Sequence, residues 1–295
     1  MSNILLSICI PTYNRSEILD NTLSELFLNP EFDHDKIEVV VSDNCSTDDT
    51  KVIVKKYPHV KYFVNDVNIK DYNFTKVLTY SNGKYIRLFN DTLVFKPGSL
   101  SFMLKVVEEN LDEKNNVLFY QNMFLNQDCS REIYSLKDYF ANVSFLSTWI
   151  ANFGIWRNDF NQLTNKDRYS ELQFPQLDWT YKIIKNGKKT IIYFSDFFTV
   201  TVPNKKGGYN IFNTFINKYL FIVRKERLAI WSYEVEKYRL FRYFAYPWLI
   251  TLLIIDKDRF SFDKKGVWMI LFKKYWYAPY FYVIMLLFGI RKIRG

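Results

Sequence analysis

A chain of 295 residues with 48% apolar residues is long enough to bury a sizeable core and too apolar to be disordered. Its 9 glycines and 8 prolines are few for this length, which argues against a loop-rich scaffold. The net charge of +9 is uneven, because residues 201–295 hold 18 Lys or Arg against 6 Asp or Glu, whereas residues 1–200 balance at −3. A basic, aromatic segment of this kind suits nucleic acid or an anionic membrane surface.

The first 100 residues alternate between short apolar runs and segments with helical periodicity. Such apolar runs, ended by turns, are typical of buried parallel strands. The alternation predicts a mostly parallel sheet with right-handed crossovers and flanking helices. We expect strands at residues 4–10, 37–41, 60–64 and 85–89. We expect helices capped by Ser16, capped by Ser46 or Thr47 with Asp48 and Asp49 in the first turn, and passing through Val77 and Leu78.

Polar side chains follow three of the expected strands. Residues 11–15 follow the first strand, Asp43 follows the second, and Asn90 and Asp91 follow the fourth. The carboxyl ends of parallel strands meet at one edge of a sheet, where such sheets bind their ligands. The alternative is that each cluster only forms a helix-capping turn, which would leave Asp43 and Asp91 without a role. We therefore expect a ligand site at this edge.

Residues 97–200 show a less regular pattern. We expect a helix that opens at residues 97–99, strands at 117–120 and 190–194, an apolar segment at 145–156 and a helix at 178–184. The stretch Lys205-Lys-Gly-Gly208 is the clearest flexible link. We place a boundary there, between an α/β domain of residues 1–204 and a region of residues 205–295. The alternative is that this basic stretch is a loop that closes over a bound substrate.

The C-terminal region contains long apolar stretches flanked by basic residues. Residues 240–255 are broken by Pro247, and residues 275–290 carry no charge and are interrupted by Pro279. Because a membrane-spanning helix needs about 20 apolar residues, we favour helices that lie in the plane of a membrane surface. An ordinary pair of core helices, a contact between two copies of the chain and a transmembrane hairpin stay open as alternatives.

The cysteines and histidines show no spacing typical of a metal centre or of nucleophilic catalysis. Cys9, Cys45 and Cys129 are odd in number, so we expect three reduced thiols in a cytosolic protein. His34 and His59 lie in polar contexts, and we expect two isolated surface residues. The N-terminus has no basic region before its apolar run, so we expect no signal peptide.

Two motifs together resemble the inverting family 2 glycosyltransferases. They are SICIPTYNR over residues 7–15 and VVVSDNCSTD over residues 39–48. The resemblance is closest to a bacterial branch of abequosyltransferase-like enzymes that build O-antigen and capsule, and it covers residues 4–105 well. It implies the GT-A fold, a Rossmann-like α/β domain with a mostly parallel sheet flanked by helices. Here that domain is followed by a helical C-terminal region.

The resemblance implies a site for a nucleoside diphosphate sugar. In relatives the loop after the first strand wraps the nucleotide, and the matching residues here are Pro11, Thr12, Tyr13 and Arg15. The planar fork of Arg15 is suited to contact phosphate. The aspartate after the second strand accepts a hydrogen bond from the pyrimidine in relatives, and Asp43 matches it. Relatives also carry an asparagine-rich donor loop, where this chain has Asn68 and Asn73.

The end of the fourth strand departs from the family. Relatives carry an aspartate-rich cluster there, whereas this chain reads LFNDTL over residues 88–93. Asn90 and Asp91 match donor-facing positions, and the usual metal ligand falls on Thr92. Mg²⁺ and Mn²⁺ bind best to several oxygen ligands, carboxylates above all, so Asp91 and Thr92 would hold either cation weakly. We expect reduced or absent metal dependence, with basic side chains in place of the cation as one alternative.

Inversion at the anomeric carbon requires a general base that takes the proton of the acceptor hydroxyl. Relatives place this acidic residue at the head of a helix in the second half of the domain, where this chain reads QLDWTY over residues 176–181. We assign the role to Asp178, with Glu171 as the second candidate. An aspartate in the first turn of a helix is also a common dipole-stabilising residue, so a capping role stays open.

The sequence therefore predicts a glycosyltransferase that moves a hexosyl or deoxyhexosyl group from a nucleoside diphosphate sugar to a lipid-linked saccharide in bacterial surface polysaccharide synthesis. A lipid-linked acceptor would account for the basic C-terminal helices, and it predicts a peripheral protein on the cytoplasmic face of the cell membrane. The alternative is a catalytically degenerate scaffold that binds sugar nucleotides for a polysaccharide synthase. A nucleic-acid partner is not expected, because no recognition motif accompanies the basic residues.

Overall fold

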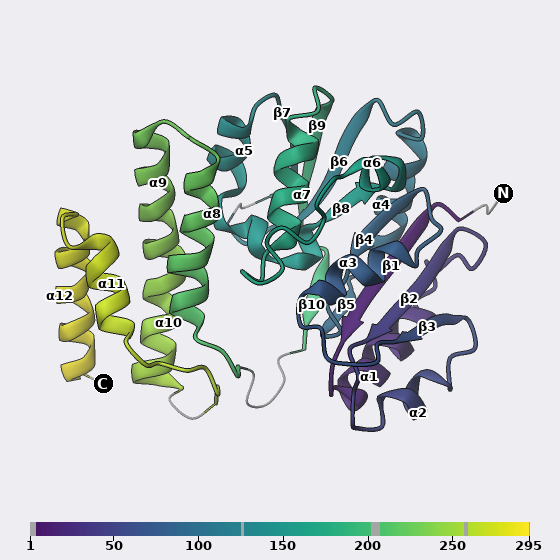
Figure 1. Cartoon of the computed structure of the whole chain (residues 1–295), viewed down its shortest axis with the longest axis horizontal. Coiled ribbons are helices and arrows are strands. Elements are labelled where there is room, and N and C mark those ends of the chain that lie inside the picture. Colours follow the sequence, from purple (N-terminus) through teal and green to yellow (C-terminus); the bar gives the residue numbers. More distant parts are fainter. Residues whose placement is uncertain (1–3, 125–126, 202–206, 257–258, 295) are drawn as a thin grey trace. The chain divides into compact units, whose positions relative to one another are not determined.

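The computed structural model describes residues 4–124, 127–201, 207–256 and 259–294 (Figure 1). The chain divides into two compact units, one of residues 1–142 and 146–201 and one of residues 143–145 and 202–295. Each unit has buried apolar side chains of its own. The boundary expected between residues 204 and 205 lies outside the described residues, as do Lys205 and Lys206.

The N-terminal unit is built on a five-stranded sheet. Every residue of β2 (Ile37–Asp43) is buried, and so is every residue of β1 (Leu6–Thr12) except Pro11. Strands β1 to β4 pair in parallel, and β8 runs antiparallel to β4. The order is β3-β2-β1-β4-β8, with β3 at Val60–Val64, β4 at Tyr85–Leu88 and β8 at Gly154–Trp156. The mostly parallel sheet predicted from the apolar runs is confirmed.

Helices cover this sheet on both faces. Successive side chains of a strand point to opposite faces, and both faces of β1 and β2 are buried. One face, which includes Ile8 and Val39, shares its core with α1 (Ser16–Leu28) and α4 (Ser99–Glu109). On the other face, α3 (Tyr72–Thr79) packs against β1, β2 and β4. The sheet is thus the middle layer of the unit.

The strand order reverses between β1 and β4. From β1 the chain builds β2 and β3 outward on one side, and it then returns to place β4 on the other side. In open parallel sheets, the crevice at the carboxyl ends of two such strands is the usual ligand site. The fold therefore points to the loops that follow β1 and β4.

The second helix begins later than the sequence predicts. The helix α2 covers Thr50–Val54, so Asp48 and Asp49 precede it and do not lie in its first turn. The Asp48 carboxylate accepts the backbone N–H of Thr50 at 3.1 Å and also that of Ser16 at 2.9 Å. Ser16 is accordingly the first residue of α1 and not its N-cap. One carboxylate caps two helices that are separate in the sequence.

The rest of this unit adds short strands and helices. The expected strands and helix are confirmed as β6 (Asn115–Gln121), β9 (Lys189–Ser195) and α7 (Pro175–Ile184). Strand β9 pairs in parallel with β6 and antiparallel with β7. The elements not predicted are β5 (Leu93–Phe95), β7 (Cys129–Ile133), β8, β10 (Phe198–Val200), α5 (Leu136–Val143) and α6 (Arg157–Gln162). The apolar segment before β8 forms the 3₁₀ turns η1 (Ser144–Thr148) and η2 (Ile150–Asn152).

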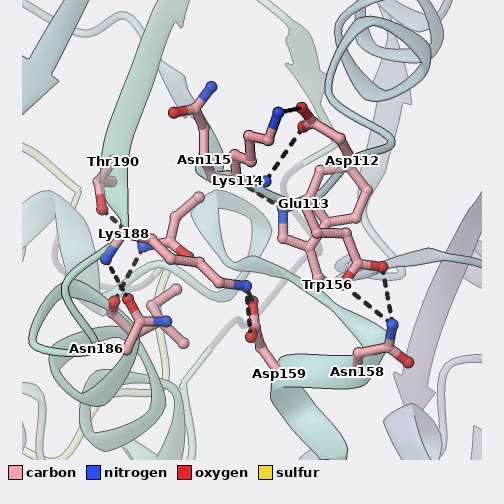
Figure 2. A network of polar contacts seen from close by, with 12 residues as sticks. Asp112, Glu113, Lys114, Asn115, Trp156, Asn158, Asp159, Asn186, Lys188 and Thr190 are labelled. Carbon is pink, nitrogen blue, oxygen red and sulfur yellow. Dashed lines mark hydrogen bonds and ion pairs between the residues drawn. The ribbon is translucent and has the colours of Figure 1, made fainter.

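A polar network fastens α6 to the start of β9 (Figure 2). The Lys188 ammonium lies 2.7 Å from both carboxylate oxygens of Asp159. Nearby, the Trp156 indole N–H donates to the backbone carbonyl of Asn115 at 2.7 Å. The Trp156 contact joins β8 to β6, while backbone pairing with β4 places this three-residue strand at the sheet edge.

The C-terminal unit is helical, as predicted. Its elements are η3 (Asn213–Tyr219), α8 (Leu220–Lys225), α9 (Ile230–Leu240), η4 (Phe241–Ala245), α10 (Tyr246–Ile250), η5 (Thr251–Ile255), α11 (Val267–Tyr275) and α12 (Pro279–Arg294). The expected break at Pro247 is wrong, because the junction residues keep helical backbone angles from α9 to η5. The π-helical segments η4 and η5 flank Pro247, and their longer hydrogen-bond spacing accommodates its missing N–H. Among the described residues, none of the helices combines the length and apolarity that crossing a bilayer requires.

Candidate functional site

The loops after β1 and β4 meet at Asp91. The Thr12 hydroxyl donates to one carboxylate oxygen of Asp91 at 3.0 Å, and the Arg15 guanidinium donates to the other at 2.8 Å. The backbone carbonyl of Asp91 accepts the Thr22 hydroxyl at 2.8 Å. Asp91 is 3% exposed, whereas the Arg15 side chain is 42% exposed. The structure therefore brings together three of the predicted donor-site residues at the reversal of strand order.

Asp43 lies at the end of β2 and is buried. One carboxylate oxygen accepts the backbone N–H of Ser46 at 2.8 Å, and the other accepts the Tyr62 hydroxyl at 2.6 Å. Burial and the nearby Asp43 charge raise the pKa of Tyr62, which keeps this hydroxyl protonated as a donor. Asp43 thus closes a local turn at the edge of the sheet where we expect the ligand. Turn formation therefore accounts for part of the role that we assigned wholly to ligand binding.

Asn14 ties the loop after β1 to the loop after β2. Its side-chain oxygen accepts the backbone N–H of Thr47 at 2.7 Å. The backbone N–H of Asn14 donates to the Ser46 hydroxyl at 2.8 Å. Asn14 has a φ of +48°, a left-handed conformation that asparagine tolerates better than most residues. The sequence reasoning missed this residue, although an asparagine next to a strand end is a recognisable turn signal.

A chain of asparagines supports the loop after β3. The Asn44 amide donates to the Asn68 side-chain oxygen at 2.9 Å, and its oxygen accepts the backbone N–H of Ile69 at 2.9 Å. Asn68 itself is exposed on this loop. Asn73 is buried, and its amide exchanges hydrogen bonds with the side chain and carbonyl of Ser42. The structure therefore places Asn68 at the surface of the predicted donor loop and Asn73 beneath it.

Asn90 and Thr92 flank Asp91. Asn90 is half-buried, and no donor among the described residues reaches its buried side-chain oxygen. Thr92 is 6% exposed, and its backbone carbonyl accepts the N–H of Thr201 at 2.8 Å. Within the described ranges, no group of three or more His, Cys, Asp or Glu side chains is arranged to hold a metal ion.

An open pocket of about 640 Å³ adjoins the donor loop. Thr75 of α3 and Asp167 both line it, and the Thr75 hydroxyl donates to the Asp167 carboxylate at 2.6 Å. Burial raises the pKa of Tyr72, and the carboxylates of Glu171 and Asp167 act in the same direction, so Glu171 lies near this lining residue although it does not line the pocket itself. The lining residues are Asn68, Ile69, Lys70, Tyr72, Thr75, Lys76, Thr79 and Asp167.

Asp178 lies in the first turn of α7, as predicted, and is buried. One of its carboxylate oxygens accepts a hydrogen bond from Arg168 at 3.1 Å, and the other lies 2.6 Å from the Lys182 ammonium. The Lys182 ammonium forms an ion pair with Asp178 but no hydrogen bond, because it donates its hydrogen bond to the Thr164 carbonyl. Because α7 packs against α3 and Arg168 follows Asp167, Asp178 is linked to the wall of the pocket.

The cysteines and histidines take no part in the contacts described above, although Cys45 belongs to the loop after β2. Cys9, Cys45 and Cys129 all belong to the described part of the chain and are free thiols, as expected. His34 and His59 are exposed but not isolated, because their ring centroids are 5.1 Å apart. The expectation of two partnerless histidines is wrong, and the reason is that the start of β2 and the start of β3 are adjacent.

Comparison with known sequences agrees with this geometry. Residues 7–174 match the family model described as Glycosyl transferase family 2. Abequosyltransferase RfbV of Salmonella typhimurium is 32% identical over 115 residues, which are 37% of this chain and 34% of that protein. GalNAc(5)-diNAcBac-PP-undecaprenol beta-1,3-glucosyltransferase of Campylobacter jejuni is 31% identical over 111 residues, 35% of each chain. The chain thus spans about a third of the length of these two relatives.

Solved structures share the fold. A fragment of S. aureus TarS superimposes with a TM-score of 0.56 at 16% identity, over 92% of this chain and 81% of that one. The mannosyltransferase PcManGT of Pyrobaculum calidifontis, in complex with GDP-Man and Mn²⁺, gives a TM-score of 0.52 at 15% identity, over 74% and 64%. At this level of identity the likeness concerns the fold, and it confirms the predicted GT-A architecture.

Proposed function

The chain belongs to glycosyl transferase family 2, and on this basis we propose that it transfers a sugar, with inversion, from a nucleoside diphosphate donor to a lipid-linked saccharide acceptor. The observation that carries the proposal is the contact of Thr12 and Arg15 with Asp91 at the reversal of strand order. Open parallel sheets bind nucleotides at this place. The contacts show that polar residues from separate loops converge there.

The proposed donor site has a base side and a sugar side. Asp43 and the loop of residues 11–15 form the base side, where Tyr13 is 43% exposed and its ring is free to stack on the nucleoside. Asn90, whose buried side-chain oxygen accepts no hydrogen bond from the described residues, and Asn68 on the exposed loop supply polar contacts to the ribose or sugar. Asn73 supports this loop from below.

For the chemistry, we assign the general base to Asp178. The acceptor hydroxyl loses its proton to the Asp178 carboxylate while its oxygen attacks the anomeric carbon. The bond from that carbon to the β-phosphate oxygen breaks on the opposite face, and the nucleoside diphosphate leaves. Arg168 is 45% exposed and can turn outward, which frees one carboxylate oxygen of Asp178 for the acceptor.

Asp178→Asn tests this assignment, with Glu171→Gln as the matched variant. We expect Asp178→Asn to lower turnover of the active donor by about 100-fold or more, because general-base catalysis contributes that much. Binding of UDP, dTDP, CDP or GDP, measured by thermal shift, stays as in the wild type. Near-wild-type turnover in Asp178→Asn together with loss in Glu171→Gln would move the base to Glu171.

The acceptor and the location follow from the C-terminal unit. Residues 267–294, which form α11 and α12, contain no Asp or Glu and several Lys and Arg. An acidic lipid surface suits this charge, so we place the protein peripherally on the cytoplasmic face of a bacterial cell membrane. There it would extend a lipid-linked saccharide of O-antigen or capsule. Pairing of two copies through the same helices is the competing use of this surface.

One observation favours a second function, a scaffold that binds sugar nucleotides without transferring them. The end of β4 retains a single carboxylate, and the candidate base Asp178 is paired with two cations. A transferase hydrolyses its donor slowly even without an acceptor, whereas a scaffold does not. Release of nucleoside diphosphate from UDP-, dTDP- or GDP-sugars by the purified chain separates the two.

A further inference from the structure

The end of β4 does not fit a divalent cation. Asp91 is the single carboxylate between Leu88 and Leu93, and Thr92 stands where relatives carry the usual ligand. Both Asp91 oxygens already accept hydrogen bonds, one of them from a cation. Mg²⁺ and Mn²⁺ bind best where several oxygen ligands, carboxylates above all, can surround them. A dication at Asp91 would also meet the positive charge of Arg15 at close range.

Arg15 supplies positive charge at the same place. Its guanidinium carries five N–H donors, and one of its nitrogens is fixed on Asp91 at 2.8 Å. The side chain is 42% exposed, so part of it is accessible to a ligand that binds at this edge of the sheet. Planar guanidinium groups bind phosphate oxygens in pairs, which a point charge cannot do.

We propose that Arg15 takes the place of the divalent cation and neutralises the donor diphosphate, with Asp91 as its anchor. This inference rests on the proposed function, since it concerns the same donor site. The ion pair with the buried Asp91 and the hydrogen bond from Thr12 to Asp91 orient the guanidinium before the donor binds. As the bond to the β-phosphate oxygen breaks, the leaving diphosphate gains negative charge, and a preorganised cation stabilises it.

Calorimetric titration of UDP, CDP, dTDP and GDP into the full chain tests the inference. We expect the preferred nucleotide to bind equally well in excess EDTA and in added Mn²⁺, within about twofold. Arg15→Ala should weaken binding by roughly 10- to 100-fold, the effect of losing one hydrogen bond to a charged group. Arg15→Lys, which keeps the charge without the planar fork, should lie in between.

One variant serves as the control, and a second tests a competing cation. Arg131→Ala removes an exposed arginine from β7, in a different sheet, and should bind as the wild type does. Lys70→Ala removes a cation from the donor loop. Melting curves establish that each variant is folded, and the EDTA arm on the wild type requires no variant.

Each outcome decides a different point. Binding that disappears in EDTA and returns with Mn²⁺ would overturn the inference and leave the proposed function standing. Loss of binding in Lys70→Ala with none in Arg15→Ala would overturn it as well, by moving the cation to another residue. If the wild type binds none of the four nucleotides under any condition, the proposed function itself fails.

Discussion

Asp43 has a structural role in the fold, and we propose that the same carboxylate also binds the donor. It closes the turn to Ser46 and receives the hydroxyl of Tyr62, which fixes its position at the end of β2. A carboxylate oxygen can accept more than one hydrogen bond. Asp43 therefore keeps capacity for a nucleoside base, and its orientation is set before the base arrives.

A pair of variants separates these two roles. Asp43→Asn keeps the shape and can still accept from Tyr62, but it loses the charge and half of the acceptor atoms. We expect the preferred nucleoside diphosphate to bind about tenfold more weakly or worse, because a hydrogen bond to a charged group contributes about 1.5–3 kcal/mol. Calorimetric titration measures the change.

Tyr62→Phe is the matched control for that variant. It removes the donor to Asp43 but leaves the carboxylate, so we expect a loss of about 1 kcal/mol in the free energy of unfolding and nucleotide binding within a few-fold of the wild type. If Asp43→Asn binds nucleotide normally and both variants unfold more easily, Asp43 has a structural role alone.

The sequence indicated which polar residues lie at this edge of the sheet better than it indicated the contacts that support them. Asp43 and Asp91 are recognisable because acidic residues follow buried strands at one sheet edge. Asn68 and Asn73 look alike in sequence, yet the first is exposed and the second is buried against Ser42. That difference depends on how α3 packs on the sheet, which a local pattern does not contain.

At the scale of elements, continuous apolar runs predicted the parallel strands well, because both faces of such strands are buried. The errors arose where a residue has its partner in another element. Asp48 was expected to serve the helix that follows it, but it also caps α1. Pro247 was expected to break a helix, but π-helical segments on both sides of it keep the helix continuous.

Glu236 of α9 is a buried acid within the C-terminal unit. One oxygen accepts the hydroxyls of Ser144 at 2.9 Å and Tyr219 at 2.6 Å. No donor among the described residues reaches the other oxygen. Burial raises the pKa of Glu236 to about 7, although these two hydroxyls and Arg239 act in the opposite direction. The side chain is thus easier to accommodate when it is protonated.

This raised pKa makes stability depend on pH. Because the folded state holds the Glu236 proton more tightly than the unfolded state, the contribution is complete below about pH 4.5 and is lost as the pH rises to about 7. We expect Glu236→Gln to remove this dependence and to gain up to about 3 kcal/mol over the wild type above neutral pH, at about 1.4 kcal/mol for each pKa unit. Thermal melting at about pH 5 and about pH 8 measures the difference.

Glu226→Gln provides the control, since it makes the same substitution at the end of α8, outside this hydrogen-bonded group. It should follow the wild type at both pH values. Equal pH dependence in Glu236→Gln and in the wild type would show that Glu236 is charged in the folded protein without a penalty.

At the scale of the whole molecule, charge and apolar exposure concentrate in the C-terminal region. The helices α11 and α12 lie side by side (yellow in Figure 1), and Trp268 packs against Phe288 between them. Many exposed side chains of this hairpin are apolar, and its charged residues are all basic. The exposed apolar residues are Trp268, Met269, Phe272, Trp276, Tyr277, Tyr282, Val283, Leu286, Leu287, Ile290 and Ile293.

A vesicle experiment tests whether this hairpin docks on lipid. Leu286 and Ile293 are 66% and 88% exposed, so replacing both with Gln should leave the fold intact while removing apolar area. We expect the wild type to co-sediment with vesicles that contain phosphatidylglycerol, more weakly at high salt, and poorly with phosphatidylcholine alone, because basic residues near an anionic surface each contribute about 1 kcal/mol. The double variant should bind at least about tenfold more weakly, since each buried side chain of this size contributes about 1.5–3 kcal/mol.

The matched control removes a similar apolar area elsewhere in the same unit. Ile230 and Trp231 of α9 are 72% and 80% exposed, and replacing both with Gln should leave vesicle binding unchanged if the hairpin is the docking surface. A wild type that stays in solution with every vesicle and forms a dimer by light scattering, which Leu286→Gln with Ile293→Gln dissociates, would assign the same surface to a second copy of the chain. In that case the apolar surface of the hairpin is an interface between subunits, and the main structural argument for a lipid-linked acceptor no longer holds.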